Sequence, residues 1–287
     1  MKNIIITGTS SGFGFEAVKI LASQGHVVYA TMRNVDSKNA ASAQALMEWA
    51  SENKAKVEVV ELDVTDDSSV KNAISHITKS SNGLIDVLVN NAGIYFIGMS
   101  ETLTTAQTEQ MFKVNVLGAD RMMKAVLPFM HKQKDGLIIN ITSIQSRNFI
   151  PVVSTYNATK AALDALSIGY HYELKASGID VATIQPGIYE TTDIVNKSLQ
   201  PGNPGAEVHY SDSMVKLKHS IYALFEPTDK SPDPREVARV ILDLIEMPKG
   251  ERPLWTLINW QFADQLDAIN KSIKGVVDNL LKHLEVA

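Results

Sequence analysis

The sequence predicts a single doubly wound α/β domain, in which helices cover both faces of a central parallel sheet. Short apolar runs of strand length alternate along the chain with segments whose apolar residues recur at helical spacing. A glycine-rich turn joins the first apolar run directly to the first helical segment. The chain has 287 residues, enough to bury one full core, and we expect one domain over residues 1–287.

Composition and charge argue against several classes of function. The hydrophobic content of 45% and charged content of 21% are ordinary for a soluble globular protein. The net charge is -5 and no basic block stands out, which argues against a nucleic-acid partner. With no Cys, the chain can form no disulfide or thiolate metal site. No apolar run approaches the roughly 20 residues of a membrane helix, and because the N-terminus enters a strand at once, no signal peptide is expected. We therefore expect a cytoplasmic protein with no membrane partner.

Residues 2–25 contain a strand, a glycine-rich turn and a helix in immediate succession. The β-branched run 3–6 is long enough for one buried strand, and from Phe15 apolar residues recur at helical spacing as far as Gly25. The turn between them reads T-G-x-x-x-G-x-G over residues 7–14. Glycines let the backbone approach a phosphate closely, and a helix N-terminus offers unpaired N–H groups. The turn is therefore a candidate pyrophosphate site; the alternative is a strand-to-helix turn that binds nothing.

This turn resembles that of the short-chain dehydrogenase/reductase family, whose sheet is Rossmann-like. The resemblance covers residues 2–192 with six signatures in the same order along the chain. It implies a nicotinamide dinucleotide lying across the turn. The cofactor contacts that it implies there are Gly8, Ser10, Ser11, Gly12, Phe13 and Gly14.

Further strands and helices follow the first unit in alternation. Strands are expected over residues 26–31, 57–62, 84–89, 136–143, 179–185 and 253–258. Helices are expected over residues 40–53, 66–80, 104–133, 156–170, 233–247 and 260–284. Alternation of this kind is typical of parallel strands, which need long crossover connections.

The end of the second strand bears on the choice of cofactor. In dinucleotide-binding folds this strand end meets the adenosine ribose, where an acidic side chain would bond the 2′-hydroxyl. Here Thr31 holds that place, Arg33 follows it, and Asp36 lies further into the loop. A basic side chain without a nearby acid favours a 2′-phosphate, so NADP(H) is favoured, with NAD(H) as the alternative. Arg33 could equally be a solvated loop charge.

Two more signatures of the resembled family follow the third and fourth strands. Asp63 and Val64 follow the third strand, where the family's Asp bonds the adenine amino group; alternatively, Asp63 caps the next helix. The sequence N-N-A-G at 90–93 directly follows the fourth strand, and small residues there let the backbone lie against a cofactor. The resemblance implies cofactor contacts at Asn90, Ala92 and Gly93.

A further signature, P-G-x-x-x-T, follows the sixth strand. In the resembled family it lies near the nicotinamide carboxamide. The cofactor contacts carried over on that basis are Pro186, Gly187, Ile188 and Thr191. Pro-Gly alone is only a turn signal.

Four polar residues are the candidate catalytic set. Tyr156 and Lys160 stand four apart at the start of a helix and so share one face, where an ammonium would lower the pKa of the phenol from near ~10. The phenol could then exchange a proton with an alcohol or carbonyl oxygen. Ser143 stands 13 residues before Tyr156, which is the family's spacing, and could hold the same oxygen. The resemblance also gives Lys160 a contact with the ribose, and gives Asn115 a backbone carbonyl that holds a water beside Lys160. A helix-packing role is the alternative for Asn115.

The chain departs from the resembled family in three places. Arg147 stands where small residues are usual, and either shapes the pocket mouth or is solvated. Residues 193–230, polar and rich in Pro and Gly, are expected to form a substrate lid, or a surface excursion that packs on itself. Residues 260–287 form an expected helical tail whose apolar stripe serves core packing or a subunit contact.

The substrate is expected to be a small carbonyl or alcohol. Tyr189, Phe149, Ile150 and the lid suggest an apolar pocket for a lipophilic carbonyl such as a steroid or retinoid. The resemblance implies a homodimer or homotetramer. The seven His show no metal-ligand spacing, so no metal site is expected.

The predicted function is NAD(P)-dependent hydride transfer between nicotinamide and a carbonyl or secondary alcohol. A dinucleotide-binding sensor without turnover is one alternative, against which the complete set of Ser143, Tyr156 and Lys160 argues. A sugar-nucleotide epimerase or dehydratase is another, although such enzymes usually carry a larger C-terminal substrate domain.

Overall fold

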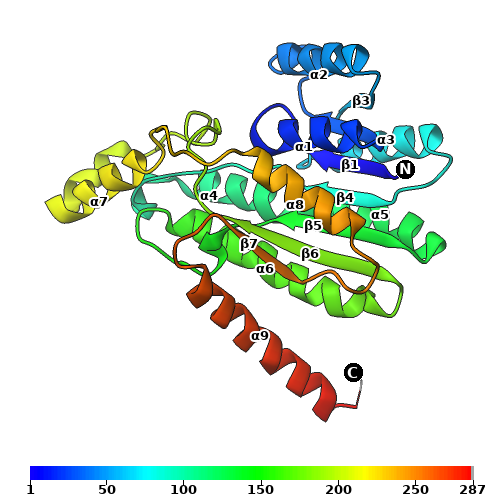
Figure 1. The fold of residues 1–287 in the computed structure, drawn as a ribbon. Coiled ribbons are helices and arrows are strands. Elements are labelled where there is room, and N and C mark those ends of the chain that lie inside the picture. The colour runs from blue at the N-terminus through cyan, green and yellow to red at the C-terminus, as the bar shows by residue number, and fades with distance from the viewer. Residues whose placement is uncertain (286–287) are drawn as a thin grey trace.

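A computed structural model describes residues 1–285. Within them, a seven-stranded sheet runs in the order β3-β2-β1-β4-β5-β6-β7, and every neighbouring pair of strands is parallel (Figure 1). The strands are β1 Asn3–Thr7, β2 Val27–Met32, β3 Lys56–Glu61, β4 Val87–Asn90, β5 Gly136–Ile141, β6 Ile179–Pro186 and β7 Trp255–Ile258. The predicted doubly wound α/β fold is confirmed.

The fourth strand is shorter than the sequence predicts. The apolar run from residue 84 suggests a strand over 84–89, but β4 begins at Val87. The backbone N–H of Ile85 donates to the Gln133 side chain (2.9 Å) rather than to a neighbouring strand. Leu84 is half exposed. The first residues of the run therefore belong to the turn that enters the sheet.

Helices cover both faces of the sheet, as the alternating pattern predicts. Their bounds are α1 Gly12–Ser23, α2 Ala40–Glu52, α3 Asp67–Ser80, α4 Thr105–Phe112, α5 Ala119–Gln133, α6 Ser154–Lys175, α7 Asp212–Ala223, α8 Arg235–Glu246 and α9 Ala263–His283. Side chains of α1, α2 and α8 pack on one face of the strands, and those of α3, α5 and α6 on the other. The Asp66 side chain caps α3 by accepting from the Ser69 backbone N–H, so Asp63 is not needed for that role.

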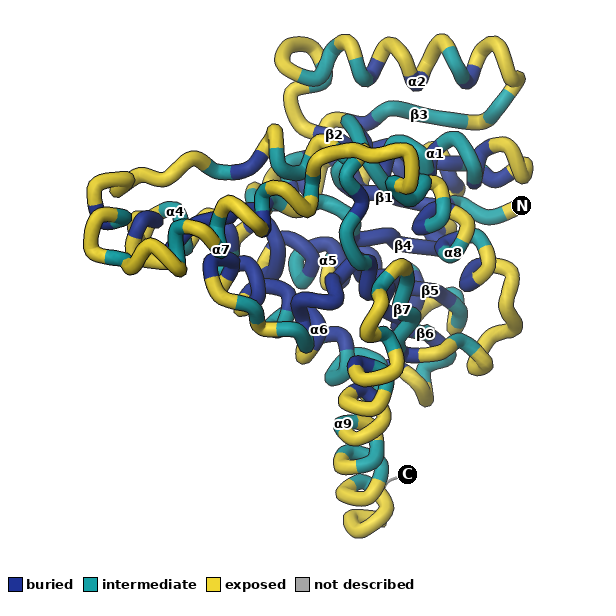
Figure 2. The backbone as a smooth tube through the Cα atoms, turned by 60° about the vertical axis from the view of Figure 1, so that its left-hand side comes forward, coloured by how far each residue is buried: buried dark blue, intermediate teal, exposed yellow. Residues whose placement is uncertain are grey.

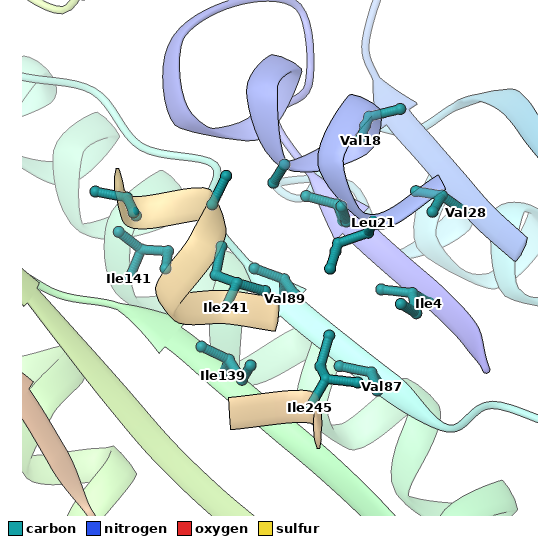
Figure 3. Close-up of a cluster of buried hydrophobic side chains, with 14 of the residues drawn as sticks. Ile4, Val18, Leu21, Val28, Val87, Val89, Ile139, Ile141, Ile241 and Ile245 are labelled. Atoms are coloured by element: carbon teal, nitrogen blue, oxygen red, sulfur yellow. The ribbon is translucent and has the colours of Figure 1, made fainter. Parts of the chain in front are cut away.

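Successive strand residues supply the two cores in turn. Ile4 and Ile6 point to the face covered by α1 and α8, where they pack with Ile241 and Ile245, whereas Ile5 points to the opposite face (Figure 3). The strand order reverses between β1 and β4. Crevices at such a reversal, beyond the carboxyl ends of the strands, are where ligands bind in this architecture.

The long helical region predicted over residues 104–133 is interrupted. A π-helical stretch, Lys113–Gly118, lies between α4 and α5 and contains Asn115. π-Helical turns are rare, and many occur at functional sites.

The segment over residues 193–230, here called the lid segment, folds back over residues 95–107. It contains a 3₁₀ turn, Pro204–His209, and α7. The Leu199 N–H donates to the Tyr95 carbonyl (2.9 Å), and the Tyr222 hydroxyl donates to the Ile97 carbonyl (3.2 Å). The segment therefore packs on the body of the protein and not only on itself.

The C-terminal helix α9 extends outward from the body of the molecule (Figures 1 and 2), although the Tyr172 hydroxyl of α6 still donates to Asp278 along it (2.7 Å). Only Leu266 and Asn270 are buried along it, whereas Val276 is 67% exposed and Leu280 is 56% exposed. Of the two expected roles of the stripe, core packing is not seen at Val276 and Leu280, and a subunit contact stays a prediction. Residues 286 and 287 of the predicted tail lie outside the described residues. None of the described helices has the length and apolar character needed to cross a membrane.

Candidate active site

A cavity of about 600 Å³ opens at the carboxyl ends of the central strands. It is lined by the glycine-rich turn after β1, the ends of β2 to β6, the start of α6 and the lid segment. Sixteen predicted site residues line it: Gly8, Ser10, Ser11, Gly12, Phe13, Arg33, Asp63, Val64, Ala92, Gly93, Ser143, Tyr156, Lys160, Pro186, Gly187 and Ile188.

The glycine-rich turn packs so closely that side chains would not fit at two of its positions. Gly8 has φ +72°, and a Cβ there would lie 2.7 Å from the Ala92 Cα. A Cβ on Gly14 would lie 2.5 Å from both the Asn91 amide and the Gly8 carbonyl. Gly14 therefore serves packing beneath the turn rather than direct contact with a ligand, and it is not among the cavity-lining residues.

Asn91 fastens the turn after β4 to the glycine-rich turn. Its Nδ2 donates to the carbonyls of Thr7 and Gly8, at 2.9 Å each. The Thr7 hydroxyl in return accepts the backbone N–H groups of Asn91 and Ala92, at 3.0 Å each. Asn91 is not among the residues predicted for the site, although its place in N-N-A-G was the available signal.

The N-terminus of α1 has the features of an anion site. The Ser11 side chain, at the N-cap position, accepts no hydrogen bond from the helix, so the first-turn N–H groups lack a side-chain cap. Lys197 of the lid segment donates from Nζ to the Ser11 hydroxyl (2.8 Å). Sequence reasoning missed Lys197, because 186 residues separate it from Ser11. A turn with no room for a side chain at Gly8 or Gly14, with uncapped N–H groups and a nearby cation, fits a dinucleotide pyrophosphate.

Arg33 and Lys38 line the cavity near the end of β2, whereas Asp36 is exposed and does not. The Arg33 guanidinium lies 3.9 Å from the Asp63 carboxylate, and both side chains are partly exposed. Asp63 also accepts from the backbone N–H and the hydroxyl of Thr65 (2.8 and 2.7 Å). Arg33 is therefore within reach of an anion at the ribose end of the cavity, with Asp63 beside it.

Tyr156 and Lys160 lie on the cavity wall formed by α6, and Ser143, just after β5, lines the same cavity. The Lys160 ammonium donates to the Ile141 carbonyl (2.8 Å) and lies 5.7 Å from the centre of the Tyr156 ring. The Ser143 hydroxyl accepts from the Gln145 backbone N–H (3.1 Å). The three side chains come from two adjacent elements and face one space.

The expected lowering of the Tyr156 pKa is not found in this structure. Burial raises the pKa of Tyr156, and the neighbouring Tyr95 adds to the rise, while the Ser143 hydroxyl opposes it. Burial also lowers the pKa of Lys160 to about 8. Desolvation disfavours both charged forms, so it outweighs the attraction of an ammonium for a phenolate here.

Asn115 does not line the cavity but lies behind it. Its side-chain oxygen accepts from the Ile94 N–H (2.8 Å), and its Nδ2 donates to the Ile94 carbonyl (2.9 Å) and to the Thr159 hydroxyl (3.0 Å). A Cβ on Gly93 would lie 3.5 Å from the Asn115 oxygen and 3.8 Å from Lys160 Nζ. Asn115 thus links the π-helical turn to the helix that carries Lys160.

Three further expectations differ from the observed positions. The Asn90 side chain is buried away from the cavity and donates to Asn140 (2.8 Å). Thr191 is exposed, and its neighbour Thr192 lines the cavity instead. Phe149, expected in the apolar pocket, is 65% exposed.

Within residues 1–285, no three His, Asp or Glu side chains gather as a metal ion would require.

Arg147 is neither solvated nor at the pocket mouth. Its side chain is 9% exposed and forms an ion pair with the fully buried Asp164 of α6. Its Nε also donates to Asn270 of α9 (2.9 Å).

Comparison with known proteins agrees with this geometry. The model of the family described as short chain dehydrogenase matches residues 2–202. The chain belongs to the short-chain dehydrogenase family. It is therefore an oxidoreductase, and the resemblance seen in its sequence is confirmed.

Relatives in this family span nearly the whole chain. The 3-ketodihydrosphingosine reductase of Bacteroides thetaiotaomicron is 32% identical over 98% of this chain and 95% of its own. Human retinol dehydrogenase 8 is 28% identical over 94% of this chain and 86% of its own. The alcohol dehydrogenase of Thermococcus sibiricus, solved in complex with 5-hydroxy-NADP, is 26% identical with a TM-score of 0.72, over 90% of this chain and 96% of that one.

Proposed function

We propose that this short-chain dehydrogenase transfers a hydride between a nicotinamide dinucleotide and a carbonyl or secondary-alcohol substrate. The observation that carries the proposal is the meeting of Ser143, Tyr156 and Lys160 in one cavity with the glycine-rich turn. A bound nicotinamide would supply the hydride chemistry. The protein's own task is then to hold the substrate oxygen and move a proton.

Each polar side chain has a role in that task. Tyr156 gives a proton to the carbonyl oxygen in reduction and takes it back in oxidation. Ser143 holds the same oxygen by hydrogen bonding. Lys160 binds the cofactor ribose and, when charged, stabilises the phenolate of Tyr156. Asn115 fixes the π-helical turn, whose backbone carbonyl supports a proton relay through water to Lys160.

Turnover of a carbonyl panel with NADPH and NADH tests the reaction. Tyr156→Phe removes only the transferable proton, so we expect loss of most turnover with cofactor affinity kept. Tyr172→Phe, whose hydroxyl bonds Asp278 away from the cavity, is the matched control. Near-normal turnover by Tyr156→Phe would contradict the proton-transfer role of Tyr156. Cofactor binding by wild type without turnover would support a sensor, and product formed without net NADPH change would support an epimerase.

We propose NADP(H) as the preferred cofactor. Arg33 and Lys38 at the end of β2 give the cavity two cations near the expected 2′-phosphate, and Lys197 adds a third cation at the glycine-rich turn. One charge-assisted hydrogen bond of roughly 1.5–3 kcal/mol corresponds to about ten- to over a hundredfold discrimination. Arg33→Ala should lower kcat/KM for NADPH by that order and leave NADH nearly unchanged, whereas Arg235→Ala on α8 should change neither. A wild type that prefers NADH contradicts the assignment.

A lipophilic carbonyl is the proposed substrate class. Beyond Tyr156 the cavity is lined by apolar side chains from the body and from the lid segment: Ile94, Tyr95, Ile188, Ile194 and Phe225. The names of two relatives, a 3-ketodihydrosphingosine reductase and a retinol dehydrogenase, point to long apolar substrates. We expect kcat/KM to rise with chain length across a series of aliphatic ketones. A flat or falling series would exclude this class.

We further propose that α9 pairs with α9 of a second copy. Its exposed residues Ile269, Val276 and Leu280 follow the a/d spacing of a coiled coil. Asp264 lies in its first turn and Lys282 in its last, so antiparallel pairing would bring these two opposite charges together. Val276→Asp with Leu280→Asp should shift a dimer to monomer in light scattering, whereas Asn279→Asp should not. A monomeric wild type contradicts the pairing of α9.

A cytoplasmic location of the protein stays a prediction.

A further inference from the structure

The loop that carries Ser143 is anchored at its far end by a buried charge. Ser143 is followed by the 3₁₀ turn Ile144–Ser146 and then by Arg147. The guanidinium of Arg147 pairs with Asp164, donates to the Ser146 carbonyl (2.9 Å) and donates to Asn270 (2.9 Å). It also lies 5.8 Å from the centre of the Trp255 ring. One side chain thus joins the loop to α6, α9 and the edge strand β7.

Asp164 connects this anchor to the helix that carries Tyr156 and Lys160. The three residues follow one another at intervals of four, so they lie along one face of α6. The Asp164 carboxylate is fully buried and accepts from Trp255 Nε1 (3.2 Å) and Gln185 Nε2 (3.3 Å) in addition to Arg147. A buried carboxylate with this many donors is held in one place.

Asn270 closes the network from the C-terminal helix. It is 2% exposed, and its two side-chain polar atoms bond residues of two different elements. Oδ1 accepts from Arg147, and Nδ2 donates to Gln185 Oε1 (2.8 Å). Gln185 in turn donates to the Ser146 hydroxyl (2.9 Å). Among the described residues, none of these side chains has a buried polar atom without a partner.

We propose that Arg147, Asp164, Gln185 and Asn270 are positioning residues that set the place of Ser143, so that α9 completes the active site. The inference rests on the oxygen-binding role proposed for Ser143. Removing the Asn270 amide leaves Arg147 Nε and Gln185 Oε1 buried without partners, and the loop must shift to satisfy them. A displacement of about 1 Å at a catalytic group can cost on the order of a hundredfold in rate.

The test is a double-mutant cycle between Asn270→Ala and Ser143→Ala in the full-length chain. The readouts are kcat for a reducible ketone at saturating NADPH, the Kd of NADPH, and the melting temperature. Asn270→Ala alone should lower kcat about tenfold or more and change the Kd less than about twofold. In the Ser143→Ala background it should cause no further loss of kcat. Asn279→Ala, exposed on the same helix, is the matched control.

The outcomes separate this inference from the proposed function. If Ser143→Ala lowers kcat but Asn270→Ala does not, or if Asn270→Ala costs the same in both backgrounds, only the positioning inference is overturned. If Ser143→Ala leaves kcat unchanged, the oxygen-binding role of Ser143 is contradicted, and the positioning inference that rests on it is contradicted too. The same cycle with Asn270→Ser, which keeps a hydroxyl, measures the coupling if the alanine variant does not fold.

Discussion

Replacing Lys160 with methionine should remove a pH dependence of folding stability. Lys160 is 5% exposed, and burial lowers its pKa from 10.5 to about 8. Between these two values the unfolded chain binds this proton and the folded chain does not. Stability of the wild type should therefore rise with pH across that window, because the unfolded state holds more protons there.

The size of the effect follows from the difference between the two pKa values. The buried ammonium costs the folded state about 3 kcal/mol near neutral pH, and about 2 kcal/mol of this is recovered by pH about 9.5. The hydrogen bond from Nζ to the Ile141 carbonyl (2.8 Å) does not prevent this, because a neutral amine can donate it as well. Methionine has a similar length and no charge, so Lys160→Met should lack the slope.

Urea unfolding of the cofactor-free protein, at several pH values between about 7 and about 9.5, measures the difference directly. The wild type should gain about 2 kcal/mol relative to Lys160→Met across that range. Lys71→Met, at an exposed position of α3, should keep the wild-type slope. Equal slopes for wild type and Lys160→Met would show that the folded protein keeps Lys160 charged, and the reasoning from burial would be refuted.

Three other perturbations test the cavity and the tail. Gly8→Ala should lower the melting temperature and weaken NADPH binding, because its Cβ would lie 2.7 Å from the Ala92 Cα; calorimetry and titration measure both. Thr7→Val removes the acceptor of two partly buried backbone N–H groups and should cost about 1 kcal/mol or more in denaturant unfolding. A chain ending at Trp260 lacks Asn270 and should have a lower melting temperature and a lower kcat than wild type. An unchanged kcat in the folded fraction would mean that α9 does not serve the site.

Local patterns made much of the fold and part of the site predictable. The strand, glycine-rich turn and helix at the N-terminus, and the i, i+4 pair of Tyr156 and Lys160, depend on contacts between near neighbours. The sequence therefore carries them directly. The same holds for the alternation of strands and helices, since each element has its own period. Boundaries moved where a distant side chain intervened, as Gln133 does at Ile85.

Long-range partners account for what the sequence could not provide. Lys197 reaches Ser11 across 186 residues, and Arg147 reaches Asn270 across 123. Nothing within either local segment indicates the partner. A lone arginine in a loop is ordinarily solvated, and it is the fold that brings Asp164 beside Arg147 and excludes water from both. Asn270 was likewise hidden, because the apolar stripe around it suggested packing rather than a hydrogen-bonded role.

The burial of Tyr156 and Lys160 bears on how the site becomes active. With its pKa raised, Tyr156 is held neutral in the folded chain, whereas the lowered pKa of Lys160, about 8, leaves its ammonium only weakly favoured near neutral pH. The expectation that an ammonium lowers the tyrosine pKa requires a charged Lys160, and a buried charge is stabilised by hydrogen-bond acceptors or an opposite charge. Within residues 1–285, the hydrogen-bond acceptor of Lys160 Nζ is the Ile141 carbonyl. We infer that the ribose hydroxyls and phosphates of a bound dinucleotide would favour the ammonium. Binding should then be coupled to proton uptake near pH about 8. Calorimetric titration in two buffers of different ionisation enthalpy measures that uptake, and its absence in wild type would show that Lys160 is charged before the cofactor arrives.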